Sequence, residues 1–212
     1  GILVGIGLGG TAISIPMAIV GKHFPLSNRT IAMSLVTAIG SFGYFLSPLL
    51  TTYSLSENGW QITLIAFLIA LFIGLIVSYF VRSPSLEQSI ETPNSQSTLE
   101  AIKEAFASKS YILLVSGFFV CGFHITLVGT HVPTYVVDRG LESWTAAAIL
   151  SLIGLFNIIG SLLSGYLSTK ISKKIILSVI YSLRGLSIIL FIFLPASNIN
   201  AFIFGASFGF LW

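Results

Sequence analysis

Charged residues are scarce in this 212-residue chain, in which Asp, Glu, Lys and Arg make up 8% and hydrophobic residues 55%. An ordinary soluble domain carries about 25% charged residues, so this composition excludes a water-soluble surface. The charges fall between apolar blocks of about 20 residues, the length at which an α-helix crosses a hydrocarbon core of about 30 Å. Because these blocks are continuous rather than alternating, the strands of an outer-membrane barrel are excluded as well. The sequence predicts an all-α fold, a polytopic transmembrane helical bundle.

Cysteine is almost missing, and other reactive side chains are few. The one cysteine, Cys121, lies inside an apolar block, which excludes a disulfide framework and a multi-cysteine metal site. Three histidines and a single Asp make a nucleophile with a matching base hard to assemble. The net charge of +3 is too small and too scattered to indicate nucleic-acid binding. We therefore predict that the protein is not an enzyme and has no catalytic residue, cofactor, metal site or nucleic-acid partner.

Helix breakers divide the apolar blocks into six full spans and a truncated seventh. We place them at residues 1–21, 31–53, 60–81, 111–136, 144–168 and 175–194, with the seventh from residue 199. The chain opens without Met inside an apolar run and stops inside another at Trp212. We expect it to be a fragment of a longer protein, whose missing helices would be partners of these spans within the lipid bilayer.

A single long connection, residues 82–110, separates the spans into two groups. Its composition from Ser83 to Thr98, rich in Ser, Thr, Gln and Glu, cannot bury enough apolar surface to order itself. We interpret it as a linker between two transmembrane halves. Residues 1–81 would be the end of an N-terminal half, with three helices. Residues 111–212 would be the start of a C-terminal half, with three helices and part of a fourth.

The end of the linker has the pattern of a short amphipathic helix. Ser97 and Glu100 have the spacing of a capping box. Leu99, Ile102 and Phe106 recur on one helical face. We expect this helix to lie on the cytoplasmic membrane surface, with a partner-binding helix as the alternative.

Lysine and arginine are distributed unevenly between alternate loops. One set of loops holds eight of them, whereas the other set holds only Arg139. Cytoplasmic loops carry the positive excess, so we expect linker 82–110 to be cytoplasmic in a multi-pass protein of the bacterial inner (plasma) membrane. The eight residues are Lys22, Arg29, Arg82, Lys103, Lys109, Lys170, Lys173 and Lys174.

Arg184 is the basic residue that lies inside a predicted span. It comes ten residues after Lys174, which at about 1.5 Å per residue places it roughly 15 Å deep, near the bilayer centre. A cation there must contact a cavity or a partner. Its planar guanidinium suits a carboxylate or phosphate, which indicates an anionic substrate. A structural arginine, bonded to backbone carbonyls or to a carboxylate elsewhere in the protein, is the alternative.

Two further polar residues, His124 and Asn157, fall at mid-span by the same counting. His124 is a candidate for substrate contact because imidazole titrates near neutral pH, and Asn157 is a similar candidate. A hydrogen bond between helices is the default interpretation of both.

Small residues recur at helical spacing within the spans. Gly40 with Gly43, and Gly154 with Ser161 and Gly165, are predicted to let helix backbones approach each other closely.

Several short motifs are shared with a known family. They are Cys121–His124, His131–Tyr135, Asp138–Leu141, Gly154–Ser161 and Tyr181–Gly185. Through them the chain from about Phe118 to Trp212 resembles the second half of the major facilitator superfamily, and in particular its monocarboxylate-transporter-like branch. The resemblance implies that the spans are roughly helices four to ten of a partial twelve-helix fold.

Residues Gly165 to Lys174 resemble a loop motif of that superfamily, in which a glycine, an aspartate and basic residues help to hold one conformation. Gly165, Lys170, Lys173 and Lys174 match the motif. Thr169 stands where the motif has its aspartate, so the charge relay of the motif is not expected here.

A second departure concerns the substrate. The monocarboxylate family has an aspartate and an arginine four residues apart in its eighth helix, where they couple protons to anion binding. The matching positions in this chain are Asn157 and Ser161, so the proton-coupling pair is not expected here. Asn157 and Ser161, together with Arg184 and His124, are the candidate substrate-binding residues.

The resemblance and the spans together predict a secondary active transporter of a small organic solute that works by alternating access. An organic anion such as a monocarboxylate is the candidate substrate, with a coupling ion or counter-substrate as a further small-molecule partner. The alternative is a seven-helix receptor-like protein or another integral membrane protein without transport activity.

Overall fold

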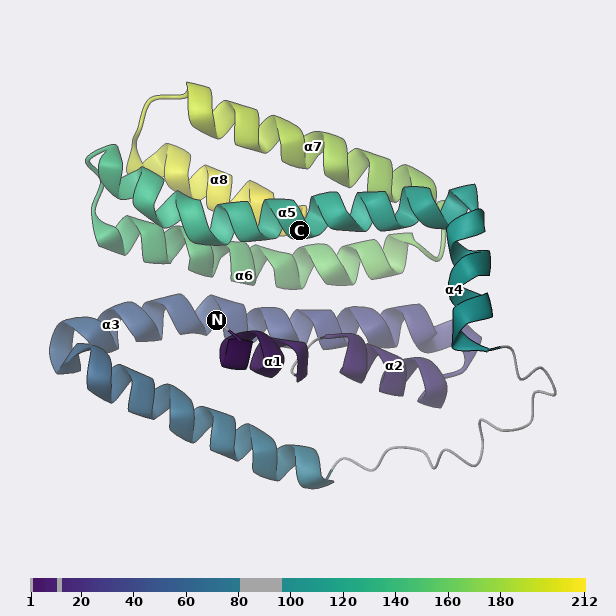
Figure 1. Ribbon diagram of the computed structural model, residues 1–212. Helices are drawn as coiled ribbons and strands as arrows, with labels where there is room; N and C mark the ends of the chain where they lie inside the picture. The colour runs from purple at the N-terminus through teal and green to yellow at the C-terminus, as the bar shows by residue number, and fades with distance from the viewer. Residues whose placement is uncertain (1, 11–12, 81–96) are drawn as a thin grey trace. The chain divides into compact units, whose positions relative to one another are not determined.

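The computed structural model describes residues 2–10, 13–80 and 97–212, and these residues form helices joined by short turns (Figure 1). The all-α prediction is confirmed, since no strand occurs in the described ranges. Residues 82–96 of the predicted linker lie outside them. The helices are α1 (Ile2–Gly10), α2 (Ser14–His23), α3 (Leu26–Phe80), α4 (Thr98–Ala107), α5 (Lys109–Asp138), α6 (Ser143–Leu167), α7 (Lys173–Phe193) and α8 (Asn198–Phe210).

The chain divides into two compact units. The first consists of Gly1–Ser83 together with Val136–Trp212, and the second is Pro84–Tyr135. The first unit thus contains helices from both sides of the predicted linker, whereas α4 and most of α5 make up the second.

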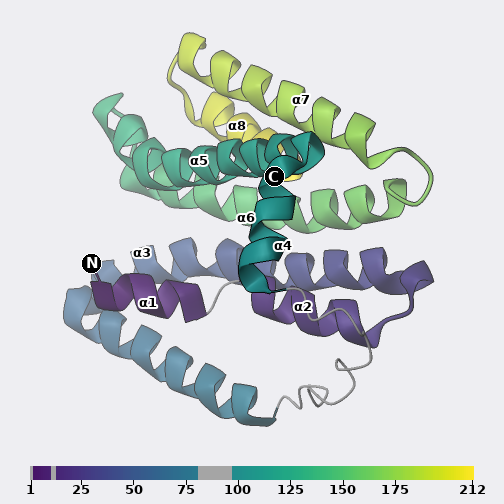
Figure 2. The ribbon, with the colours of Figure 1, turned by 45° about the vertical axis from the view of Figure 1, so that its right-hand side comes forward.

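Helix α3 contains two predicted spans and bends sharply between them at Gly59 (Figure 2). This glycine has a φ of +76°, a left-handed conformation that glycine adopts without steric cost. The hydroxyls of Ser54 and Thr63 are 2.8 Å apart across the bend, and the side chain of Thr63 is buried. A single residue therefore makes the turn that the sequence predicted as a longer break from Ser54 to Gly59.

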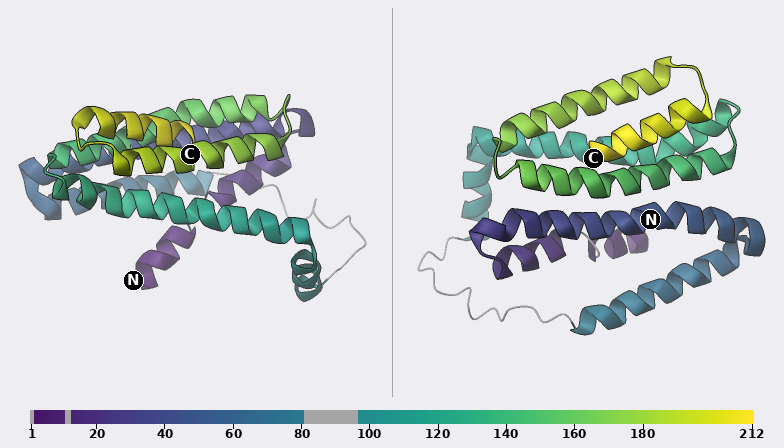
Figure 3. Two further views of the ribbon diagram at one scale, coloured as in Figure 1. Left: turned by 90° about the horizontal axis from the view of Figure 1, so that it is seen from above. Right: turned by 180° about the vertical axis from the view of Figure 1, so that it is seen from behind.

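Helix α6 lies between α3 and α8 in the first unit (Figure 3). It runs antiparallel to α3, because its Gly154 packs against Phe45 whereas its later Gly165 packs against the earlier Ser34. It runs parallel to α8, whose Gly205 and Gly209 pack against Ile149 and Ile153 of α6. A Cβ at Gly154 or Gly209 would lie less than 3.0 Å from backbone atoms of the neighbouring helix, so these two contacts require glycine.

Helices α7 and α8 form an antiparallel hairpin. The rings of Phe191 and Phe204 stack at a centroid distance of 4.1 Å. Each helix begins at a serine cap, since the Ser172 hydroxyl accepts from the Ile175 amide and the Ser197 hydroxyl from the Asn200 amide. Such caps satisfy backbone donors that have no partner within the helix.

Two of the basic loops of the first unit lie at the same end of it. Because Gly165 packs against Ser34 and lies beside the Thr30 carbonyl, the start of α3 and the end of α6 are neighbours. Arg29 at the start of α3 and Lys170 after α6 are therefore at the same end. This placement agrees with the loop assignment on which the predicted orientation depends.

Among the described residues, four helices are long and apolar enough to cross a membrane: the range Asn28–Phe80 of α3, and α5, α6 and α7. The two arms of α3 correspond to two of the predicted spans. The predicted span at residues 1–21 is divided between α1 and α2, and α8 has 13 residues. The second half of the predicted linker forms α4, with the expected capping box between Ser97 and Glu100.

Candidate functional site

Arg184 lies on α7 and is 2% exposed. Its Nε donates a hydrogen bond of 3.1 Å to the carbonyl of Leu211, directly after α8, and its Nη2 donates to the same oxygen. The guanidinium therefore ties α7 to the end of α8, as the structural alternative for this residue requires.

Aromatic rings surround the same guanidinium. The centroids of the Tyr181 and Phe208 rings each lie 5.6 Å from its central carbon. Ring faces attract a cation, and the attraction strengthens when water is excluded. Carbonyl and rings together fix the position of the cation within an apolar part of the chain.

Asn157 lies on the face of α6 that contacts α3. Its Nδ2 donates a 2.9 Å hydrogen bond to the hydroxyl of Ser41, and the Ser41 hydroxyl donates to the Thr37 carbonyl at 2.8 Å. Asn157 is 8% exposed and Ser41 is 5% exposed. The structure thus joins, by a buried hydrogen bond, a helix that precedes the predicted linker to one that follows it.

Replacing Asn157 by alanine is expected to lower the unfolding free energy by about 0.6–1.7 kcal/mol, the usual range for a hydrogen bond between membrane helices. Thermal unfolding of the full-length protein in detergent measures this loss. Ser161→Ala is the matched control, because the Ser161 hydroxyl donates to the Ile158 carbonyl of its own helix. In a double-mutant cycle with Ser41→Ala, purely additive effects would contradict the bond.

The other predicted binding residues occupy different places. Ser161 is half-buried on α6, one turn after Asn157. His124 is half-buried on α5 and belongs to the second unit. Their roles in binding stay predictions, as do those of Arg184 and Asn157.

The predicted loop motif surrounds the turn from α6 to α7. Gly165 is buried against α3, whereas Lys170, Lys173 and Lys174 are exposed. The Thr169 hydroxyl, at the position of the missing aspartate, donates to the Tyr166 carbonyl at 2.7 Å. The Nζ of Lys170 lies over the Tyr166 ring, 4.7 Å from the ring centroid. The structure thus contains the buried glycine and the exposed basic turn of the motif. At the position of the motif's aspartate, it has the hydroxyl of Thr169, which is bonded within its own turn.

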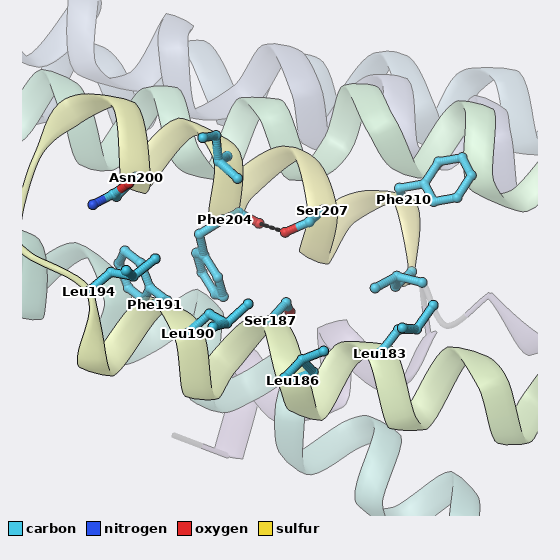
Figure 4. A pocket seen from close by; sticks show the side chains of 12 residues that line it. Leu183, Leu186, Ser187, Leu190, Phe191, Leu194, Asn200, Phe204, Ser207 and Phe210 are labelled. Atoms are coloured by element: carbon cyan, nitrogen blue, oxygen red, sulfur yellow. Dashed lines mark hydrogen bonds between the residues drawn. The ribbon is translucent and has the colours of Figure 1, made fainter.

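A groove of about 380 Å³ opens between α7 and α8 (Figure 4). The Ser207 hydroxyl donates to the Phe204 carbonyl and the Ser187 hydroxyl to the Arg184 carbonyl, so these two side chains are bonded within their own helices. The groove therefore suits apolar contact better than an anion. Its lining residues are Leu183, Leu186, Ser187, Leu190, Phe191, Leu194, Asn200, Ile203, Phe204, Ser207, Phe210 and Leu211.

Sequence reasoning did not single out three residues that are notable in the structure. Ser41 and Leu211 are the partners of Asn157 and Arg184, and the hydroxyl of Ser151 is buried without a hydrogen-bond partner in the described part of the chain. A polar residue inside a span was the available signal for the two serines. No signal singles out Leu211, because it acts through its backbone carbonyl.

Comparison with known families matches the model of the Major Facilitator Superfamily to residues 1–212. The chain belongs to this superfamily. Together with the long apolar helices, this membership identifies an integral, multi-pass membrane protein.

Two curated relatives in the superfamily are similar to the chain at low identity. The uncharacterized MFS-type transporter YcxA of Bacillus subtilis (strain 168) is 23% identical over 189 residues, covering 86% of this chain and 46% of the relative. The cis,cis-muconate transport protein of Acinetobacter baylyi is 23% identical over 169 residues, covering 74% of this chain and 40% of the relative. The chain thus spans less than half the length of the curated relatives it matches.

Proposed function

We propose that the chain is part of a secondary active transporter for a small organic anion, working by alternating access in the bacterial inner membrane. The observation that carries this proposal is the buried guanidinium of Arg184 on a membrane-spanning helix of a superfamily member. Ionisable residues at such depth mark substrate or ion pathways, since burying them without a function is costly.

The hydrogen bond to the Leu211 carbonyl orients the guanidinium of Arg184. A carbonyl is a dipole, whereas a carboxylate carries a full opposite charge that forms stronger hydrogen bonds with arginine. From Ser143 to Trp212 the chain contains no Asp or Glu. A substrate carboxylate reaching the guanidinium would form such hydrogen bonds in a geometry that arginine favours.

The name of one relative favours an organic anion without narrowing the substrate to a monocarboxylate. The relative from Acinetobacter baylyi is named for cis,cis-muconate, which is a dicarboxylate. Asn157 and Ser161 lack the charges of the monocarboxylate family's pair, and Asn157 is bonded to Ser41. Proton coupling through these two positions is therefore not part of the proposal.

The contact between α3 and α6 supports alternating access. These helices lie on opposite sides of the linker, so their contact joins the two predicted halves. Transporters of this architecture move one half against the other around a site near the midplane of the membrane. In this mechanism the buried contact would be remade or shifted during each cycle.

Replacing Arg184 by glutamine tests the anion role, because glutamine keeps an N–H donor for Leu211 while removing the charge. In proteoliposomes with the full-length protein, we expect the uptake of muconate or lactate to fall at least about tenfold in kcat/KM, a loss of about 1.4 kcal/mol. Arg184→Lys is the matched control and should retain part of the uptake. A stably folded Arg184→Gln variant with wild-type uptake of both anions would contradict the role.

A further inference from the structure

We infer that α4 is an interfacial helix whose apolar stripe, defined as Leu99, Ile102 and Phe106, lies in the headgroup and upper acyl region of the bilayer. This inference does not depend on the transported substrate. It concerns the second unit by itself, in which α4 and the spanning part of α5 are neighbours along the chain.

The stripe has the geometry of a membrane-binding face. Leu99 is 63% exposed, Ile102 48% and Phe106 62%. Their spacing of three and four residues places them on one side of α4. Glu100 and Glu104 lie on the opposite side by the same helical counting, so the helix is amphipathic.

The corner between α4 and α5 determines where α4 lies. Ser108, with an extended backbone, is the one residue between the two helices, and its hydroxyl accepts from the Tyr111 amide. Figures 1 and 2 show α4 running crosswise to α5. Helix α5 is long and apolar enough to cross a membrane. A helix that leaves the end of a spanning helix crosswise, after a single residue, must run along the membrane surface.

The residues around the corner between α4 and α5 suit the headgroup region of the bilayer. The Phe106 and Tyr111 rings meet edge to face at 5.9 Å, which joins the stripe to the beginning of α5. Tyrosine and tryptophan favour the headgroup level because one edge of each ring is polar. Lys103, next to the stripe, and Lys109, at the start of α5, can extend their ammonium groups to lipid phosphates while their alkyl stems stay on apolar surface.

Apolar contact, rather than charge, carries the binding. Helix α4 contains two glutamates and one lysine, so an anionic membrane surface offers it no net attraction. Attachment should therefore be the same in vesicles of phosphatidylcholine alone and in vesicles that also contain phosphatidylglycerol. This independence separates an inserted apolar stripe from a polybasic segment held by surface potential.

A nitroxide scan of residues 99–106 in the full-length protein tests the inference. The protein is reconstituted in phosphatidylcholine vesicles on a background without other cysteines, with Cys121 replaced by Ser. Collision rates with oxygen, which concentrates in the bilayer, and with a water-soluble nickel complex are then compared. Ile102→Cys is the test position and Glu104→Cys is its matched control on the opposite face.

The expected result is a reversal of preference between the two positions. The label at residue 102 should collide more with oxygen and the label at residue 104 more with nickel, with a helical period across the scan. Nickel access at both positions would overturn the inference because the stripe would then be in water. Shielding of residue 102 from both reagents would overturn it in favour of a protein partner. Loss of the helical period would show that α4 is not a helix in the bilayer.

Discussion

Replacing Gly154 by alanine is expected to lower the unfolding free energy by about 1–3 kcal/mol or more, as overpacking of a well-packed contact does. A Cβ at this position would lie 2.7 Å from the Cα of Phe45 and 2.7 Å from the carbonyl carbon of Tyr44. These are backbone atoms, which cannot move aside as the end of a flexible side chain can. Helices α3 and α6 must separate to admit the methyl group, and this separation also lengthens the bond between Asn157 and Ser41.

Thermal unfolding of the full-length protein measures this effect, and Gly40→Ala is its matched control. Gly40 lies on α3, and a Cβ there would meet no atom of the described residues within 4 Å. Alanine is favoured over glycine in a helix by about 1 kcal/mol, so the control should be neutral or stabilising. Equal stability of the two alanine variants would contradict the close contact between α3 and α6.

Replacing Gly209 by valine is expected to destabilise the protein by about 3 kcal/mol or more and to abolish anion uptake. A Cβ there would lie 2.6 Å from the Cα of Ile153 in α6. Valine adds two further carbon atoms against that backbone, so the end of α8 must shift. Leu211 comes two residues later, and its carbonyl would move away from the guanidinium of Arg184.

Unfolding and uptake measured on the same preparation test this link between packing and site. Gly185→Ala is the control, since Gly185 follows Arg184 directly and a Cβ there meets no described atom within 4 Å. The control should keep both stability and uptake. Wild-type uptake in the Gly209→Val variant would show that the position of the Leu211 carbonyl does not matter to transport.

Close packing of small residues was predicted for two sets of helix positions, Gly40 with Gly43 and Gly154 with Ser161 and Gly165, and among the described residues it occurs at the glycines of the second set. Gly154 and Gly165 pack against α3 as expected, whereas a Cβ at Gly40 or Gly43 meets no described atom within 4 Å. Spacing along a helix shows which glycines share a face. It does not show which of these faces meets another helix, and the two sets differ in this respect.

Arg184 shows the same limit for a single residue. Counting from Lys174 predicted its depth, and the desolvation cost of a cation at that depth predicted that it would have partners. Its bond to Leu211 spans 27 residues of sequence, and the acceptor is a backbone carbonyl that any residue type would provide. Residue type therefore indicated that a partner exists, but not which one.

The sequence by itself determined that the chain lies in a lipid bilayer, that it is helical, where most spans lie and where α4 starts. Hydrophobic runs and capping boxes show these features because each is formed by residues close together in the sequence. The tertiary structure alone decided that α3 bends at one residue, that α6 lies between α3 and α8, and that Asn157 and Arg184 bond to Ser41 and Leu211. These features depend on the rotation and register of helices against each other. Rotation and register follow from the fit of whole surfaces, to which each residue contributes only a part.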